Sequence, residues 1–218
     1  MQIPNPKSRI PVFQAILDEE ASARAGWPLL DLAQAFLDGG ARLLQVRAKR
    51  ASGAAFLDIA SAIVALAHRA GAAVIVNDRA DIAALSGADG VHVGQDDLTP
   101  ALVRRIVGDG AIVGLSTHTP AQLIDACHAP VSYVAVGPVF ATGTKATGYD
   151  AIGLERVRAA AATTGARRLP LVAIGGITLD TAASAIAAGA TSVAVISDLL
   201  STGDPAMRVR EFIERLEV

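Results

Sequence analysis

Eight short runs of apolar, often β-branched residues recur along the chain, and most are followed by an amphipathic, alanine-rich stretch. Near-continuous apolar runs are typical of parallel strands that are buried on both faces. Eight strands alternating with eight helices, without a second composition zone, predict one α/β domain over residues 1–218, a closed (β/α)8 or TIM barrel. The runs are VFQAILD from Val12, LLQVRAK from Leu43, AVIVND from Ala73, GVHVG from Gly90, IVGLST from Ile112, YVAVGP from Tyr133, LVAIGG from Leu171 and SVAVIS from Ser192.

The stretches between the runs carry helix start and stop signals. Pro28 begins one helix and Gly39 follows its last turn, while Thr119 and Pro120 suit the N-cap and first position of another. The alternative fold is a doubly wound open sheet. Its first strand–helix turn would carry a G-x-G-x-x-G phosphate motif, which this sequence lacks, and it needs fewer than eight units.

Composition excludes several classes of protein. A hydrophobic share of 52% with 18% charged residues supports a buried core, and a net charge of −2 gives no sign of a nucleic-acid partner. The apolar runs stop well short of the roughly 20 residues that span a bilayer, and prolines interrupt the N-terminal MQIPNPKSRIPVF. Because Cys127 is the single cysteine, a reducing compartment fits. We expect a soluble, cytoplasmic protein without a membrane partner.

Cationic side chains follow the second run. Gln45, Arg47 and Lys49 are spaced two apart, so in a strand they share one face. Two cations would be costly in the layer between strands and helices, which favours a direction toward the barrel axis. The alternative is that both extend into solvent at a strand end.

Acidic side chains follow the third and fourth runs. Asp78 and Asp97 would stand at neighbouring strand ends, where two carboxylates and phosphate oxygens can share Mg²⁺. The alternative is local: Asp78 pairs with Arg79 or caps the next helix, and Asp97 caps its own. The cations after the second run favour the metal site.

Three loops have the composition of phosphate sites. Gly175–Gly176 follow the seventh run and Ser197 follows the eighth, where this fold often holds phosphate on backbone N–H groups. The loop after the sixth run adds two hydroxyls and a cation, from Thr142, Thr144 and Lys145.

The histidines give weaker signals. His92 lies inside GVHVG and is interpreted as a hydrogen-bonded core residue, while His68 and His128 fall late in helices and are expected at the surface. His118 follows Ser116 and is a candidate for substrate contact. There is no Cys/His spacing of a metal site and no nucleophile with a suitably placed base.

Six motifs together resemble the thiamine phosphate synthase family, in the same order and from the second run to the eighth: LLQVRAK, VNDRADIAALSGADGVHVGQDDL, GLSTHT, YVAVGPVFATGTK, LVAIGGIT and VAVISDLL. The resemblance implies a (β/α)8 barrel with Mg²⁺ as cofactor. It implies a reaction that joins hydroxymethylpyrimidine diphosphate to hydroxyethylthiazole phosphate, forming thiamine phosphate and releasing diphosphate.

The resemblance also implies roles for individual residues. Asp78 and Asp97 would hold Mg²⁺. The pyrimidine diphosphate would contact Gln45, Arg47, Lys49, Asn77, Ser116 and Lys145, of which Arg47, Lys49, Ser116 and Lys145 are the expected catalytic residues. The thiazole phosphate would contact Thr142, Thr144 and the backbone at Gly176, Ile196 and Ser197. The sequence departs from the family in two places: Ala141 replaces the usual proline, and RIPVFQAILDEEASARAGWP matches poorly, so that no role is assigned within it.

Two other functions are weighed against a synthase. A thiazole tautomerase of the same superfamily typically lacks both metal aspartates, whereas VNDR, GQDD and GTK keep the synthase pattern. A non-catalytic phosphate-binding barrel would not need all the charged positions. The expected partners are therefore two small phosphorylated substrates.

Overall fold

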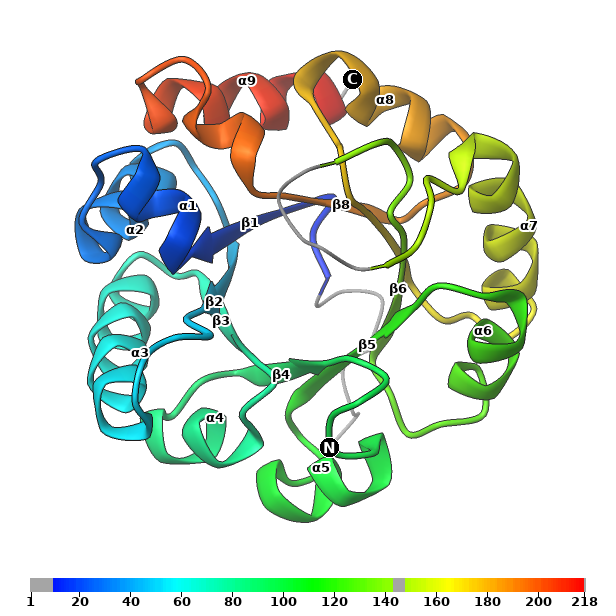
Figure 1. The fold of residues 1–218 in the computed structure, drawn as a ribbon, viewed down its shortest axis with the longest axis horizontal. Helices are drawn as coiled ribbons and strands as arrows, with labels where there is room; N and C mark the ends of the chain where they lie inside the picture. Colours follow the sequence, from blue (N-terminus) through cyan, green and yellow to red (C-terminus); the bar gives the residue numbers. More distant parts are fainter. Residues whose placement is uncertain (1–9, 143–147, 218) are drawn as a thin grey trace.

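The computed structural model describes residues 10–142 and 148–217 of the chain. Eight parallel strands pair in sequence order and close with β1 against β8, which confirms the predicted barrel (Figure 1). Each strand falls within a run identified in the sequence. The strands are β1 Phe13–Asp18, β2 Leu43–Arg47, β3 Ala73–Asn77, β4 Gly90–Val93, β5 Ile112–Thr117, β6 Tyr133–Val136, β7 Leu171–Ile174 and β8 Ser192–Val195.

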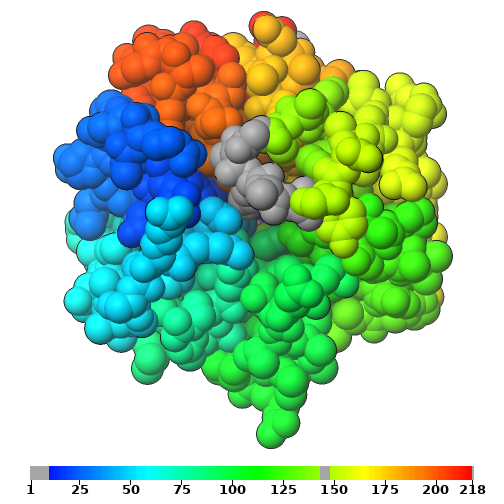
Figure 2. Space-filling model, in the orientation of Figure 1, coloured from blue at the N-terminus to red at the C-terminus, as the bar shows by residue number. Residues whose placement is uncertain are grey.

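Helices surround the strands and follow one another around the rim of the molecule (Figure 1). The sequence colours run around the space-filling surface in the same order (Figure 2). The expected single helix after each strand is replaced by two after β1, because Gly26 adopts φ +74° and Pro28 starts a new helix. Among the residues described, none of the helices combines the length and apolarity needed to cross a membrane. The elements are α1 Glu19–Arg24, α2 Leu29–Asp38, α3 Gly53–Arg69, α4 Ala80–Ser86, α5 Pro100–Val107, α6 Pro120–Ala126, α7 Gly153–Gly165, α8 Leu179–Ala187, the 3₁₀ helix η2 Ser197–Leu200 and α9 Pro205–Leu216.

The core has two layers because alternate residues of a strand face opposite sides. Strand residues such as Leu44 and Val74 point outward and pack between the strands and the helices, in the larger apolar cluster. Ile16, Leu43, Ile75 and Tyr133 belong to a second cluster that fills the barrel interior. Burying a large aliphatic side chain contributes about 1.5–3 kcal/mol. The barrel interior is therefore packed by side chains at this level and is not an open channel.

Candidate active site

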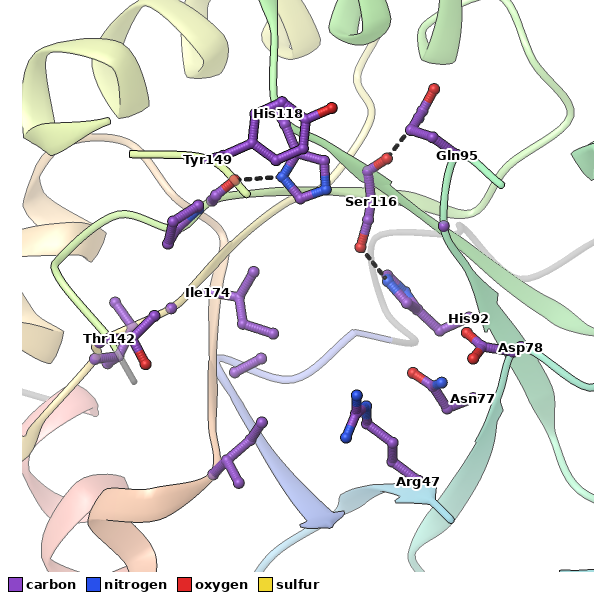
Figure 3. A pocket seen from close by; sticks show the side chains of 18 of the residues that line it. Arg47, Asn77, Asp78, His92, Gln95, Ser116, His118, Thr142, Tyr149 and Ile174 are labelled. Carbon is purple, nitrogen blue, oxygen red and sulfur yellow. Dashed lines mark hydrogen bonds between the residues drawn. The ribbon is translucent and has the colours of Figure 1, made fainter. Parts of the chain in front are cut away.

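A cavity of about 440 Å³ opens at the carboxyl ends of the strands (Figure 3). Gln45 does not line it, because it lies one inward position below Arg47 on β2 and is only 3% exposed. Thr144 and Lys145 lie outside the described residues, so their roles stay predictions. The predicted site residues that do line the cavity are Arg47, Lys49, Asn77, Asp78, Asp97, Ser116, Thr142, Gly176, Ile196 and Ser197.

Asp18, which lies in the segment without a predicted role, holds Arg47 in place. It ends β1 directly opposite Arg47 in the β1–β2 register, and its Oδ2 accepts a hydrogen bond from Arg47 Nη1. Its Oδ1 accepts the Ala21 N–H at 2.9 Å, which fixes the carboxylate at the start of α1. The side chains of Asp18 and Arg47 are 3% and 14% exposed. This partly desolvated pair therefore aims the guanidinium before any ligand binds. The sequence signal for it is an aspartate ending the first apolar run.

Two carboxylates and an ammonium group meet above β3 and β4. Lys49 Nζ lies 3.1 Å from Asp78 Oδ2, and Asp97 is close enough for its charge to act on the Asp78 carboxyl group. The Gly94 N–H donates to Asp97 Oδ2 at 2.7 Å. Burial, followed by the negative charge of Asp97, raises the pKa of Asp78, while Lys49 opposes the change. A carboxylate whose ionisation is disfavoured by burial and by a neighbouring negative charge marks a place where added positive charge is stabilising.

This donor set fits a hard divalent cation. Within residues 10–142 and 148–217, no group of three or more His, Cys, Asp or Glu side chains is arranged to hold a metal. Mg²⁺ usually takes only one or two carboxylates from a protein and completes its octahedron with water and phosphate oxygens. Asp78 and Asp97 therefore fit Mg²⁺ that is shared with a phosphorylated ligand.

The opposite side of the cavity is formed by backbone. Gly175 and Gly176 turn the chain after β7 with φ +92° and +66°. A Cβ at position 176 would lie 2.6 Å from the carbonyl oxygen of Ala141, next to Thr142, so this turn packs directly against the loop after β6. Glycine thus allows the close approach that backbone N–H groups need to cradle an anion.

An ion pair fixes the last part of this backbone side. Asp198 Oδ2 accepts hydrogen bonds from the Leu179 N–H at 3.1 Å and from Arg208 Nη2 at 2.8 Å. These bonds join η2 both to the start of α8 and to α9. Because Ser197 begins η2, the ion pair holds its backbone at the edge of the cavity.

His118 is anchored to the rim of the cavity. Its Nδ1 lies 2.6 Å from the carbonyl oxygen of Gly137, and its ring stacks on Tyr149 with the centroids 4.3 Å apart (Figure 3). A carbonyl only accepts hydrogen bonds, so Nδ1 carries a proton. This nitrogen is therefore occupied in the structure and does not act as a free base.

His92 connects the core to the cavity. It hydrogen-bonds Tyr133 and Ser116, as expected for a satisfied core histidine, but it also lines the cavity, which the sequence interpretation missed. His68 and His128 are exposed, as predicted.

Comparison with known proteins decides the family. The family model described as thiamine monophosphate synthase matches residues 13–199. This chain belongs to the thiamine monophosphate synthase family. The match begins at the first residue of β1, so Asp18 falls inside it, although the segment that contains it matches the family poorly by motif.

Individual members of the thiamine monophosphate synthase family cover nearly the whole chain. A thiamine-phosphate synthase of Chlorobium luteolum is 41% identical over 93% of this chain and 92% of its own. A thiamine-phosphate synthase of Koribacter versatilis is 46% identical over 86% of each chain. Among solved structures, a thiamine phosphate pyrophosphorylase from Pyrococcus furiosus superposes with a TM-score of 0.86 at 27% identity, covering 98% of both chains.

Proposed function

We propose that this chain is a Mg²⁺-dependent thiamine phosphate synthase, which condenses hydroxymethylpyrimidine diphosphate with hydroxyethylthiazole phosphate. The observation that carries the proposal is the cluster of Asp78, Asp97 and Lys49 beside Arg47, facing a glycine-rich backbone turn across one cavity. A reaction between two phosphorylated substrates needs two anion subsites. The charged side suits the diphosphate, and the backbone side suits the single phosphate.

The reaction breaks one bond and forms one. The C–O bond between the pyrimidine methylene carbon and diphosphate breaks, and both of its electrons leave with diphosphate. The lone pair of the thiazole nitrogen then forms a C–N bond with the resulting pyrimidine-methyl cation. Negative charge develops on the leaving group, so preorganised cations lower the barrier.

The residues of the charged side divide this work. Asp78 and Asp97 would hold Mg²⁺, which supplies positive charge to the departing diphosphate. Arg47, aimed by Asp18, and Lys49, paired with Asp78, add two further cations. The remaining proposed contacts to the pyrimidine diphosphate come from Asn77, Ser116 and Lys145. Gln45 is also predicted to contact it, although in this structure its side chain is buried one inward position below Arg47 and does not line the cavity.

The residues of the backbone side would hold the second substrate. Thr142 and Thr144, with the backbone of Gly176, Ile196 and Ser197, are proposed to bind the thiazole phosphate. In this arrangement the ring nitrogen would face the pyrimidine methylene group. Since that nitrogen already has a lone pair, the attack needs no general base, and catalysis consists of positioning and electrostatics.

A single reaction tests the proposal. The purified protein is mixed with both phosphorylated substrates and Mg²⁺, and the products are identified by mass spectrometry, with reactions lacking one substrate or containing EDTA as controls. We expect thiamine phosphate and diphosphate in equal amounts, and neither in EDTA. Isomerisation of the thiazole that is independent of metal would point to the tautomerase, and binding without turnover would point to a non-catalytic barrel.

A further inference from the structure

A chain of hydrogen bonds runs from the barrel interior to the cavity. Tyr133 on β6 is 1% exposed, and its hydroxyl oxygen lies 2.8 Å from His92 Nδ1. On the other side of the imidazole, Nε2 lies 2.8 Å from Ser116 Oγ (Figure 3). Tyr133 belongs to the apolar cluster inside the barrel, and Ser116 lines the cavity. The three side chains therefore connect the dry core with the substrate end.

Gly114 makes this arrangement possible. It pairs with His92 on β4 and with Tyr133 on β6, so the three residues lie side by side across neighbouring strands. A Cβ at position 114 would lie 2.2 Å from Tyr133 Cζ and 2.4 Å from His92 Nδ1. Without that atom, the phenol and the imidazole meet over β5. Close packing thus fixes both rings before a ligand binds.

The direction of the hydrogen bonds follows from the buried phenol. Within the described part of the chain, its hydroxyl has one hydrogen-bond partner, His92 Nδ1. Burial raises the pKa of Tyr133 far above its usual range, so the hydroxyl keeps its proton. A buried donor without an acceptor is costly, and the hydroxyl therefore donates to Nδ1. The one proton of a neutral imidazole is then on Nε2, which donates to Ser116 Oγ.

We propose that Tyr133 is a positioning residue that, through His92, makes Ser116 a hydrogen-bond donor toward the pyrimidine substrate. Because Ser116 Oγ accepts the proton of Nε2, its own proton is directed elsewhere, and the cavity is the space that it lines. Pyrimidine nitrogens and diphosphate oxygens are both acceptors, so either suits this donor. The identity of the substrate rests on the proposed function, whereas the direction of the hydrogen bonds from Tyr133 to Ser116 does not.

His118 gives an internal reference for the first test. Its Nδ1 donates to a carbonyl, so its neutral ring carries the proton on Nδ1, opposite to His92. Side-chain ¹⁵N NMR of histidine-labelled protein, at a pH where both rings are neutral, reports these tautomers, and His92→Asn assigns the signal. We expect Nε2–H for His92 and Nδ1–H for His118. Tyr133→Phe should change only the His92 signal. An Nδ1–H tautomer of His92 in the unmodified protein overturns the proposal.

Steady-state kinetics give the second test, with Thr117→Val as the matched control. Thr117 on β5 is 1% exposed, and its hydroxyl donates to the Ala135 carbonyl at 2.9 Å. Since successive residues of a strand point to opposite faces, its side chain lies on the other face from that of Ser116. Tyr133→Phe should raise the KM for the pyrimidine diphosphate about fivefold to tenfold, as expected for one lost hydrogen bond. The KM for the thiazole phosphate should change by less than about twofold. Thr117→Val should lower thermal stability but change neither KM.

A double mutant shows whether Tyr133 acts through Ser116. In a Ser116→Ala background, Tyr133→Phe should have no further effect on the KM for the pyrimidine diphosphate. Equal effects of Tyr133→Phe with and without Ser116 overturn the proposal. If the unmodified protein forms no thiamine phosphate, the proposed function fails. The tautomer of His92 still decides the direction of the hydrogen bonds from Tyr133 to Ser116.

Discussion

The two sides of the cavity offer binding groups of different origin. Next to β2, β3 and β4, the side chains of Arg47, Lys49, Asp78 and Asp97 converge. Next to β7, the path of the backbone at Gly176 brings the main chain to the cavity. On the first side, an isosteric substitution removes a charge and leaves the backbone unchanged. On the second side, adding a single carbon atom moves the backbone itself. The two sides should therefore respond to mutation in different ways.

The largest effect is expected on the charged side. Asp97→Asn and Asp78→Asn should each lower kcat by about 10²–10³, the usual cost of losing a preorganised electrostatic group. Asp81→Asn removes the same charge from an exposed position on α4 and is the matched control. Turnover measured while Mg²⁺ is varied checks this. Full activity of Asp97→Asn, or undiminished turnover in EDTA, contradicts the metal site.

Asp78→Asn, which should lower kcat, should not lower thermal stability. Because burial and Asp97 raise the pKa of Asp78 above its value in the unfolded chain, ionised Asp78 opposes folding at neutral pH. Asparagine also tolerates the left-handed φ of +66° found at this position. Asp78→Asn should therefore unfold at the same temperature or higher at pH 7, and this advantage should disappear as the pH falls below the pKa of an unfolded aspartate. Thermal unfolding at both pH values measures it.

An intermediate effect is expected on the backbone side. Gly176→Ala combines a positive φ with a contact of 2.6 Å to Ala141, so the turn must shift. The KM for the thiazole phosphate should rise about tenfold, in line with 1–2 kcal/mol of left-handed strain released by moving the backbone. Gly203→Ala has φ +80° but nothing within 4 Å, and it should lose stability without changing this KM. Equal kinetics for both variants would show that the backbone path at Gly176 does not bind substrate.

The smallest effect is expected at His118, between the two sides. Its Nδ1 is bound to a carbonyl, and the proposed reaction needs no general base. His118→Asn should therefore keep kcat within about fivefold, whereas loss of a true general base costs about 10²–10⁴. The variant is assayed beside Asp78→Asn in one coupled reaction. An inactive His118→Asn next to an active Asp78→Asn would favour the tautomerase.

The difference between the two sides also explains what the sequence could predict. β5 has the same bounds in the structure as the run IVGLST, because short β-branched runs separated by helix signals define strands well. Asp78 and Asp97 could be identified because charged residues at strand ends carry their own chemical signal. Asp18 also ends an apolar run, but its pairing with Arg47 could not be predicted, and neither could the contact of Tyr133 with His92, because both depend on which residues of neighbouring strands lie opposite each other. That register is a property of the closed barrel rather than of any local pattern.

The glycine between His92 and Tyr133 limits the order in which this sequence can change. The space above Gly114 holds either a side chain from that position or the two rings, and never both. A substitution at position 114 is therefore tolerated only after both rings have been replaced by smaller side chains, because each of them has an atom within 2.4 Å of that Cβ. Conversely, once a side chain occupies position 114, the return of either ring is blocked until the glycine is restored. The three positions can therefore change only in a fixed order, in which both rings are reduced before the glycine is replaced.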